Sequence, residues 1–63
     1  MIYSKVSIGD KIKCVDDDME TCVKGNIYTV DEVHKDGWLT VKADTGVYSD
    51  KLVDVPPDSF ILL

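Results

Sequence analysis

The chain has no arginine, and its 63 residues include one histidine, one tryptophan and one phenylalanine. Seven lysines stand against twelve acidic residues, which gives a net charge of −5. Duplex nucleic acid is bound largely by neutralising phosphates, and arginine is the usual bidentate donor to phosphate and guanine. This composition therefore argues against a duplex-binding surface.

Long apolar runs are also missing. No stretch approaches the roughly 18 apolar residues that a membrane span needs. Residues 1–5, Met-Ile-Tyr-Ser-Lys, lack the charged start followed by an apolar run that marks a signal peptide. We therefore expect a cytoplasmic protein.

The length of the chain limits what it can enclose. A single domain of this size buries only about 60% of the surface that its unfolded form exposes, which leaves no room for a deep active site. A hydrophobic fraction of 44% and a charged fraction of 30% are typical of a globular domain. We expect residues 1–63 to form one domain. His34 with Cys22 or Ser49 offers a base and a nucleophile, but such pairs occur in any chain, so we expect no enzyme activity.

Metal-ligating residues are few and poorly spaced. Cys14, Cys22 and His34 fall short of structural zinc, which takes four ligands that usually come as two tight pairs. The acidic segment 16–20 lacks the spaced Asp-x-Asp-x-Asp-Gly pattern of a calcium loop, so it is predicted to be a solvated loop. We expect no metal and no cofactor. The two cysteines bracket this loop, but in a reducing cytosol free thiols are favoured over a bridge.

Turn signals divide the chain into short runs rich in β-branched residues. They lie at Gly9-Asp10, Gly25-Asn26, Asp36-Gly37 and Thr45-Gly46, about a dozen residues apart, a rhythm typical of a meandering all-β domain. We expect five short strands: 11–15, 26–34, a strand that follows Gly37, 47–52 and 61–63. A sheet this small is expected to close into a barrel, because closure removes unprotected edges.

Both ends of this domain carry core residues. In the first strand, alternation predicts that Ile12 and Cys14 point inward, and Val6 or Ile8 fills the edge of the core. Near the other end, the segment 55–60 cannot be a central strand because consecutive prolines remove hydrogen-bond donors. It is predicted to form a single helical turn that delivers Phe60 to the core.

The long run 26–34 keeps its apolar residues on one face only if it contains a β-bulge at Asp31-Glu32. A three-residue turn at 35–37, with Gly37 in the left-handed conformation, then sets Val33 opposite Leu39. The same register predicts Val30 opposite Val41 and Tyr28 opposite Ala43. On the outer face it pairs Trp38 with His34 and Thr40 with Glu32. The orientation of Val47 and Tyr48 is left open.

Four motifs carry a resemblance to a known family: the opening at 9–14, the Lys-Gly-x-x-Tyr-x-Val run at 24–30, Asp36-Gly37, and the Pro-x-x-Phe ending at 57–60. On these residues the chain resembles the small SH3-like β-barrel proteins of bacteriophage and prophage genomes. The resemblance implies a five-stranded SH3-like barrel with a short helical turn before the last strand. It also implies a phage accessory or host-directed protein located in the host cytoplasm. No catalytic residue carries over, because the shared positions are turns and core elements.

The aromatic residues Trp38, Tyr48 and Tyr3 are the most informative surface candidates, since exposed aromatics are enriched at protein interfaces. We hypothesise an acidic protein-binding module that engages a basic protein surface, in a sharper version the cleft of a nucleic-acid-binding enzyme that it inhibits. The predicted partner-binding residues are Trp38, His34, Tyr48, Asp31, Glu32, Asp36 and Asp50.

Two alternatives stay open. The lysines Lys11, Lys13, Lys24 and Lys42, together with the aromatics, could bind a single-stranded nucleic acid, as some small barrels do. The apolar C-terminal run Ile61-Leu62-Leu63 could instead serve self-association or a structural role in a virion.

Overall fold

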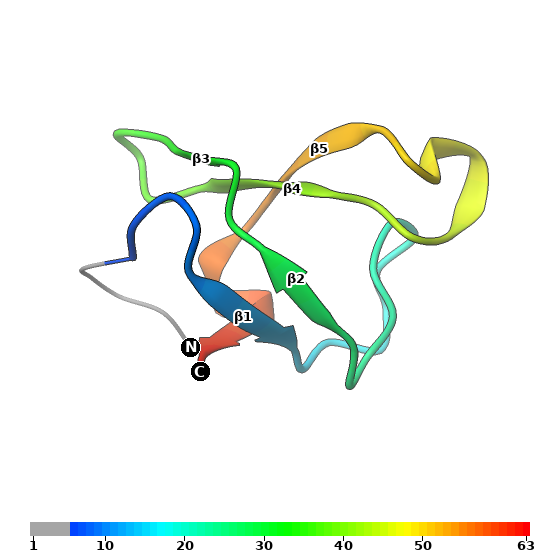
Figure 1. The fold of residues 1–63 in the computed structure, drawn as a ribbon. Helices are drawn as coiled ribbons and strands as arrows, with labels where there is room; N and C mark the ends of the chain where they lie inside the picture. Colours follow the sequence, from blue (N-terminus) through cyan, green and yellow to red (C-terminus); the bar gives the residue numbers. More distant parts are fainter. Residues whose placement is uncertain (1–5) are drawn as a thin grey trace.

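The computed structural model describes residues 6–63 (Figure 1). The described chain is all-β, as predicted, and its strands form two antiparallel three-stranded sheets with the orders β2-β1-β6 and β3-β4-β5. The strands are β1 (Lys11–Cys14), β2 (Ile27–Thr29), β3 (Glu32–Val33), β4 (Leu39–Lys42), β5 (Leu52–Val55) and β6 (Phe60–Leu62). Two 3-10 turns, η1 (Gly46–Tyr48) and η2 (Pro57–Ser59), precede β5 and β6. Within residues 6–63 no helix has the length and apolar character to cross a membrane.

Strand β1 forms the middle of the first sheet and has the predicted alternation. Ile12 and Cys14 are completely buried. On one side Cys14 lies opposite Phe60 in β6, which η2 delivers to the core as expected. Val6 packs against the edge of the core, whereas Ile8 is 70% exposed.

The segment 27–33 bends between the two sheets. The N–H of Asp31 donates to the carbonyl of Thr40, and Glu32 is also the partner of Thr40, so two residues face one as the bulge hypothesis requires. Because of this bend, residues 27–30 do not pair with β4. Tyr28 lies opposite Ile12, and the N–H of Val30 donates to the carbonyl of Asp10. The predicted pairs Tyr28 with Ala43 and Val30 with Val41 are therefore wrong.

The turn between β3 and β4 has the predicted form. Gly37 has a φ of +93°, in the left-handed region that glycine adopts at little cost. Val33 lies opposite Leu39, and the N–H of His34 donates to the carbonyl of Trp38 at 2.9 Å. Val33 itself is 43% exposed rather than buried, because it lies on the outermost strand of its sheet.

The connection between β4 and β5 differs from the prediction. Residues 47–52 were expected to form a strand, but η1 occupies 46–48 and β5 begins at Leu52. Asp50, with a φ of +68°, closes the connection by donating its N–H to the carbonyl of Ala43. Val47 is 83% exposed and Tyr48 is also exposed, so neither side chain points inward.

The core lies between the two sheets, and an aromatic pair is part of it. The rings of Tyr28 and Phe60 meet edge to face, with centroids 5.9 Å apart. The buried hydrophobic cluster consists of Ile12, Cys14, Cys22, Tyr28, Val30, Leu39, Val41, Val55 and Phe60.

The hydroxyl of Tyr28 connects β2 by hydrogen bonds to the loop before β2 and to the end of β4. It donates to a carboxylate oxygen of Asp44 at 2.5 Å and accepts the N–H of Val23 at 2.7 Å. Asn26 donates to the second oxygen of the same carboxylate at 2.9 Å. Burial of the ring, with the neighbouring Asp44, raises the pKa of Tyr28 well above its ordinary value of 10.0.

The substitution Tyr28→Phe keeps the ring and removes this junction. We expect the free energy of unfolding to fall by about 1–3 kcal/mol, because the N–H of Val23 loses its partner. Since the pKa of Tyr28 is raised on folding, wild-type stability should decline once the pH exceeds about 10, where the unfolded tyrosine ionises. Urea denaturation at pH 7 and pH 10.5 checks both effects. If Tyr28→Phe loses as much stability as the wild type between pH 7 and pH 10.5, the predicted effect of tyrosine ionisation is contradicted.

Gly46 lies where the β4–β5 connection touches the acidic loop. Its φ is +73°, and a Cβ there would lie 2.8 Å from the carbonyl oxygen of Glu20. Gly25, with a φ of +92° and open space around its Cβ position, is a matched control. Gly25→Ala should cost about 1–2 kcal/mol from left-handed strain alone. Gly46→Ala should cost a further 1–3 kcal/mol or so because backbone must move.

Urea midpoints followed by the fluorescence of Trp38 measure the difference between the two alanine variants. Equal midpoints would show that the contact between Gly46 and Glu20 has no energetic weight.

Candidate functional site

The outer face of the sheet β3-β4-β5 carries the main candidate site. Trp38 lies there just before β4 and is 42% exposed, which confirms its predicted outward position. Its backbone is held on both sides: its N–H donates to a carboxylate oxygen of Asp36 at 3.0 Å, and its carbonyl accepts the N–H of His34. Asp36 thus shapes the turn that presents the indole, in addition to carrying charge.

A polar cluster lies beside Trp38 on the same face. The hydroxyl of Thr40 donates to a carboxylate oxygen of Asp54 at 2.7 Å, while Nε2 of His34 lies 2.7 Å from that hydroxyl and 3.2 Å from the same carboxylate oxygen. Thr40 is buried beneath its two partners. The hydrogen bond from Thr40, assisted by His34, lowers the pKa of Asp54 below its ordinary value.

This cluster does not have the geometry of a nucleophile–base–acid relay. In such a relay the hydroxyl donates to one ring nitrogen of histidine and the acid holds the other. Here Thr40 donates to Asp54, and both groups contact the same nitrogen of His34. The other nucleophiles considered are elsewhere, since Cys22 is buried in the core and Ser49 follows η1. The cluster instead links His34, which follows β3, to Thr40 of β4 and Asp54 of β5 by hydrogen bonds on the outer face of the sheet.

The predicted partner-binding residues separate into two groups. Glu32 and Asp31 are exposed and face Thr40 across β3 and β4, so they lie near His34, Trp38 and Asp36. Tyr48 and Asp50 belong to the connection at the other end of β4 (Figure 1). The four residues of β4 span about 13 Å, so these two do not share the surface around Trp38.

Sequence reasoning missed the polar cluster because it depends on the position of β5. With a strand expected at 47–52, Asp50 was the acid assigned to this face. The observed strand begins at Leu52 and sets Asp54 opposite Thr40. No signal near Asp54 in the sequence marks this pairing, since the start of β5 is set by the conformation of residues 46–50.

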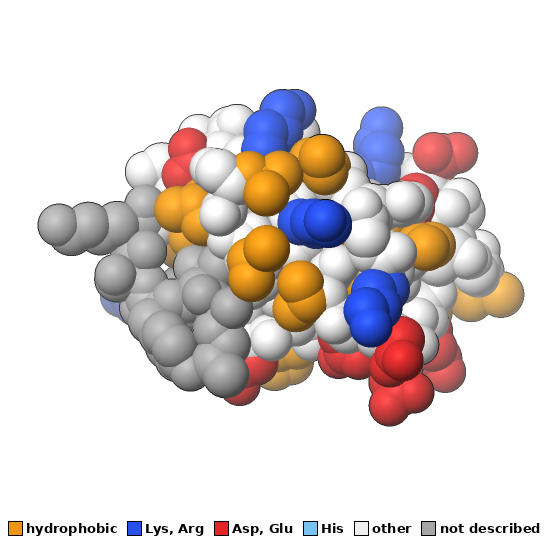
Figure 2. All heavy atoms as spheres, turned by 90° about the horizontal axis from the view of Figure 1, so that it is seen from below, with side chains coloured by type: hydrophobic (Ala, Val, Ile, Leu, Met, Phe, Trp, Pro, Cys, Tyr) orange, Lys and Arg blue, Asp and Glu red, His pale blue; other side chains and the backbone are white. Residues whose placement is uncertain are grey.

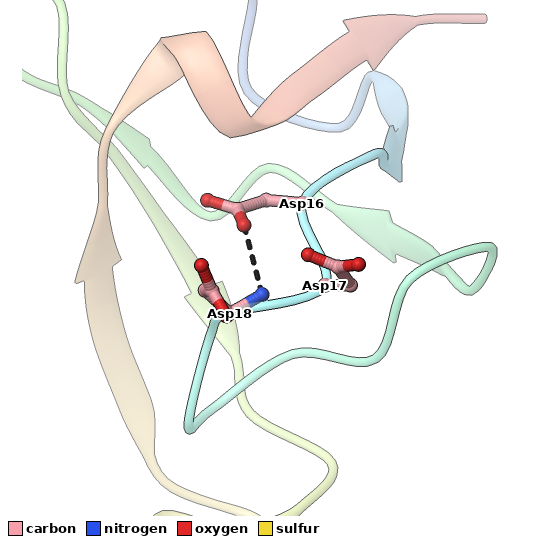
Figure 3. Close-up of side chains that lie close together, drawn as sticks. All are labelled: Asp16, Asp17 and Asp18. Carbon is pink, nitrogen blue, oxygen red and sulfur yellow. Dashed lines mark hydrogen bonds between the residues drawn. The ribbon is translucent and has the colours of Figure 1, made fainter.

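The acidic loop is partly structural (Figure 3). One carboxylate oxygen of Asp16 accepts the N–H of Asp18 at 2.9 Å, and the other accepts the hydroxyl of buried Ser59 at 2.9 Å. These bonds, the backbone one first, lower the pKa of Asp16. One carboxylate oxygen from each of Asp16, Asp17 and Asp18 lies within 4.8 Å of the others. Both oxygens of Asp16 are nevertheless engaged, one within the loop by Asp18 and the other by Ser59 of η2.

The lysines proposed for nucleic-acid binding are divided between the two sheets. Lys11 and Lys13 are in β1, Lys24 is in the loop before β2, and Lys42 is in β4 on the other sheet. Of the aromatics proposed with them, Trp38 is exposed just before β4 and Tyr48 is exposed in η1. Tyr3 lies outside the described residues. Cys14 and Cys22 are buried free thiols, and burial raises the pKa of Cys22.

Comparisons of the chain with models of known protein families, with curated proteins and with solved structures find no match.

The variants Asp16→Ala and Asp17→Ala test the structural role of the acidic loop. Asp16→Ala should lower the urea midpoint at pH 7, because Ser59 and the N–H of Asp18 lose their acceptor, whereas Asp17→Ala should leave it nearly unchanged. Because the pKa of Asp16 is lowered on folding, its contribution is present above about pH 3.8 and fades as the pH falls further. The gap between the two variants should therefore narrow below pH 3.8. If the two variants have equal urea midpoints at pH 7, or if the difference between their midpoints stays constant as the pH falls below 3.8, the structural role of Asp16 is contradicted.

Proposed function

We propose that this chain is a non-enzymatic protein-binding module built on a small SH3-like barrel, with the surface around Trp38 as its interface. Two features of the fold support the barrel. The bent segment 27–33 contributes a strand to each sheet, and a 3-10 turn that begins with Pro57 leads into the last strand. In a barrel of this size, function lies on loops and surface patches rather than in an enclosed pocket.

The observation that carries the proposal is the exposure of Trp38 on a rigid support. We name the Trp38 surface as Glu32, His34, Trp38 and Asp54, together with the turn residue Asp36. An exposed tryptophan offers a large contact area, and binding it costs little entropy because its backbone is already fixed by Asp36 and His34. The polar cluster beside it joins Thr40, His34 and Asp54 by hydrogen bonds.

The charge of this surface favours a basic partner. Asp36 lies in the turn before Trp38, and Glu32 and Asp54 lie on either side of Thr40 in the neighbouring strands. The whole chain has a net charge of −5. Acidic surfaces accelerate association with basic ones and set their relative orientation. The family resemblance extends the proposal to a phage accessory protein that binds a host or phage protein. A nucleic-acid-binding enzyme, which presents a basic cleft, is the partner of this kind that the protein would inhibit.

Affinity capture from a lysate of the natural host tests the interface. The tagged protein should recover one or a few specific proteins at low salt, and fewer at high salt. The double variant Trp38→Ala, Glu32→Lys should lose them, with at least a tenfold drop in recovery expected for a central aromatic contact.

Tyr48→Ala is the matched control, since it removes an exposed aromatic side chain at the other end of β4. It should recover the same proteins as the wild type. Equal recovery by the wild type and the double variant, both folded by circular dichroism, would show that the Trp38 surface is not the interface.

A further inference from the structure

The outward face of the sheet β2-β1-β6 has a charge opposite to that of the rest of the chain. Alternation along the three strands directs Lys11, Lys13, Ile27, Thr29 and Ile61 away from the core. The chain has twelve acidic residues, yet none is among these outward residues of the three strands. The face is therefore basic and apolar, although the net charge of the chain is −5.

The strand register arranges these side chains in a row. Lys13 lies opposite Ile27 in β2 and opposite Ile61 in β6, so an apolar, a basic and an apolar side chain follow one another across the sheet. We call these three residues the Lys13 row. Ile27 is 60% exposed and Ile61 is 36% exposed. Figure 2, which views the molecule from below, shows hydrophobic side chains and lysines interspersed on this side, with acidic side chains toward the rim.

A second row next to it is ordered by hydrogen bonds. The ammonium group of Lys11 donates to the hydroxyl of Thr29 on the neighbouring strand. On the other side the N–H of Leu63 donates to the carbonyl of Lys11 at 3.1 Å. The ammonium group of Lys11 is thus directed toward β2, whereas the side chain of Lys13 has no hydrogen-bond or ion-pair partner within residues 6–63.

We infer that the Lys13 row is a second docking surface, which binds an acidic amphipathic helix of a partner protein. Successive turns of an α-helix are 5.4 Å apart, close to the 4.7–4.9 Å that separates neighbouring strands. A helix that lies across the strands with an apolar, an acidic and an apolar residue at i, i+4 and i+7 places them over Ile27, Lys13 and Ile61.

The chemistry of this face favours a protein over a nucleic acid or a lipid surface. Single-stranded nucleic acids need aromatic platforms, and the aromatics of the described strands, Tyr28 and Phe60, point into the core. Each lysine near an anionic membrane contributes about 1 kcal/mol of binding free energy. This attraction is small for a chain whose net charge is −5. The site is separate from the Trp38 surface and takes a partner of the opposite charge, so it stands whether or not that surface binds.

A titration of the 15N-labelled protein with a designed peptide tests this inference. The peptide is an alanine-based helix with Leu, Glu and Leu at i, i+4 and i+7, and its control carries Lys in place of Glu. We expect saturable shifts of the amide signals of Lys13, Ile27 and Ile61 with the Glu peptide. The Lys peptide should bind more weakly than the Glu peptide by a factor of up to about five, as expected for the loss of one exposed ion pair.

Charge variants assign the effect to the face. Lys13→Glu should reverse the preference between the two peptides, whereas Lys42→Glu, the same change in charge on the other sheet, should keep the wild-type preference. Should Lys13→Glu fail to fold, Ile27→Ser, at a well-exposed position, should weaken binding of both peptides.

Three results would overturn the proposal. One is the absence of saturable shifts at millimolar peptide, and another is shifts confined to the Trp38 surface. The third is a response of the Lys13 row to oligo-dT or to phosphatidylserine vesicles but not to the Glu peptide, which would assign the face to nucleic acid or lipid.

Discussion

The two hydrogen bonds of the Tyr28 hydroxyl hold together parts of the chain that no sheet joins. The ring of Tyr28 packs in the core against Phe60, while its hydroxyl links the N–H of Val23 to the carboxylate of Asp44. It thereby fixes the loop before β2 against the end of β4. Since the longest of the described strands have four residues, backbone pairing alone secures little, and a bridging side chain adds a direct link between the two sheets.

The two sheets share a core but present different outer faces. On β3-β4-β5 a threonine, a histidine and an aspartate form a compact polar cluster beside an exposed indole. On β2-β1-β6 the outward side chains are lysine, threonine and isoleucine. A domain of this size can separate two chemistries in this way, because alternate side chains along each short strand point either into the core or to the outer surface of the sheet.

Local features of the fold could be predicted from the sequence, and long-range pairings could not. Ile12, Cys14 and the turn at Gly37 follow from alternation and from glycine's backbone freedom, and Phe60 follows from the prolines before it. The partner of Tyr28 was wrong because the bend at Asp31 redirects the strand toward β1, a choice made by the sheet as a whole. At the candidate site, the outward position of Trp38 opposite His34 could be predicted. The place of Asp54 could not, because the register of β5 depends on a 3-10 turn that residue patterns did not reveal.

The close approach of Gly46 to the carbonyl of Glu20 ties together two loops that are 26 residues apart in the sequence. The N–H of Asp44 also donates to the carbonyl of Thr21 nearby. Because the two loops meet backbone to backbone, neither can change length unless the other is rebuilt to fit. Homologous chains that lengthen one of the paired loops should therefore show a compensating change in the other.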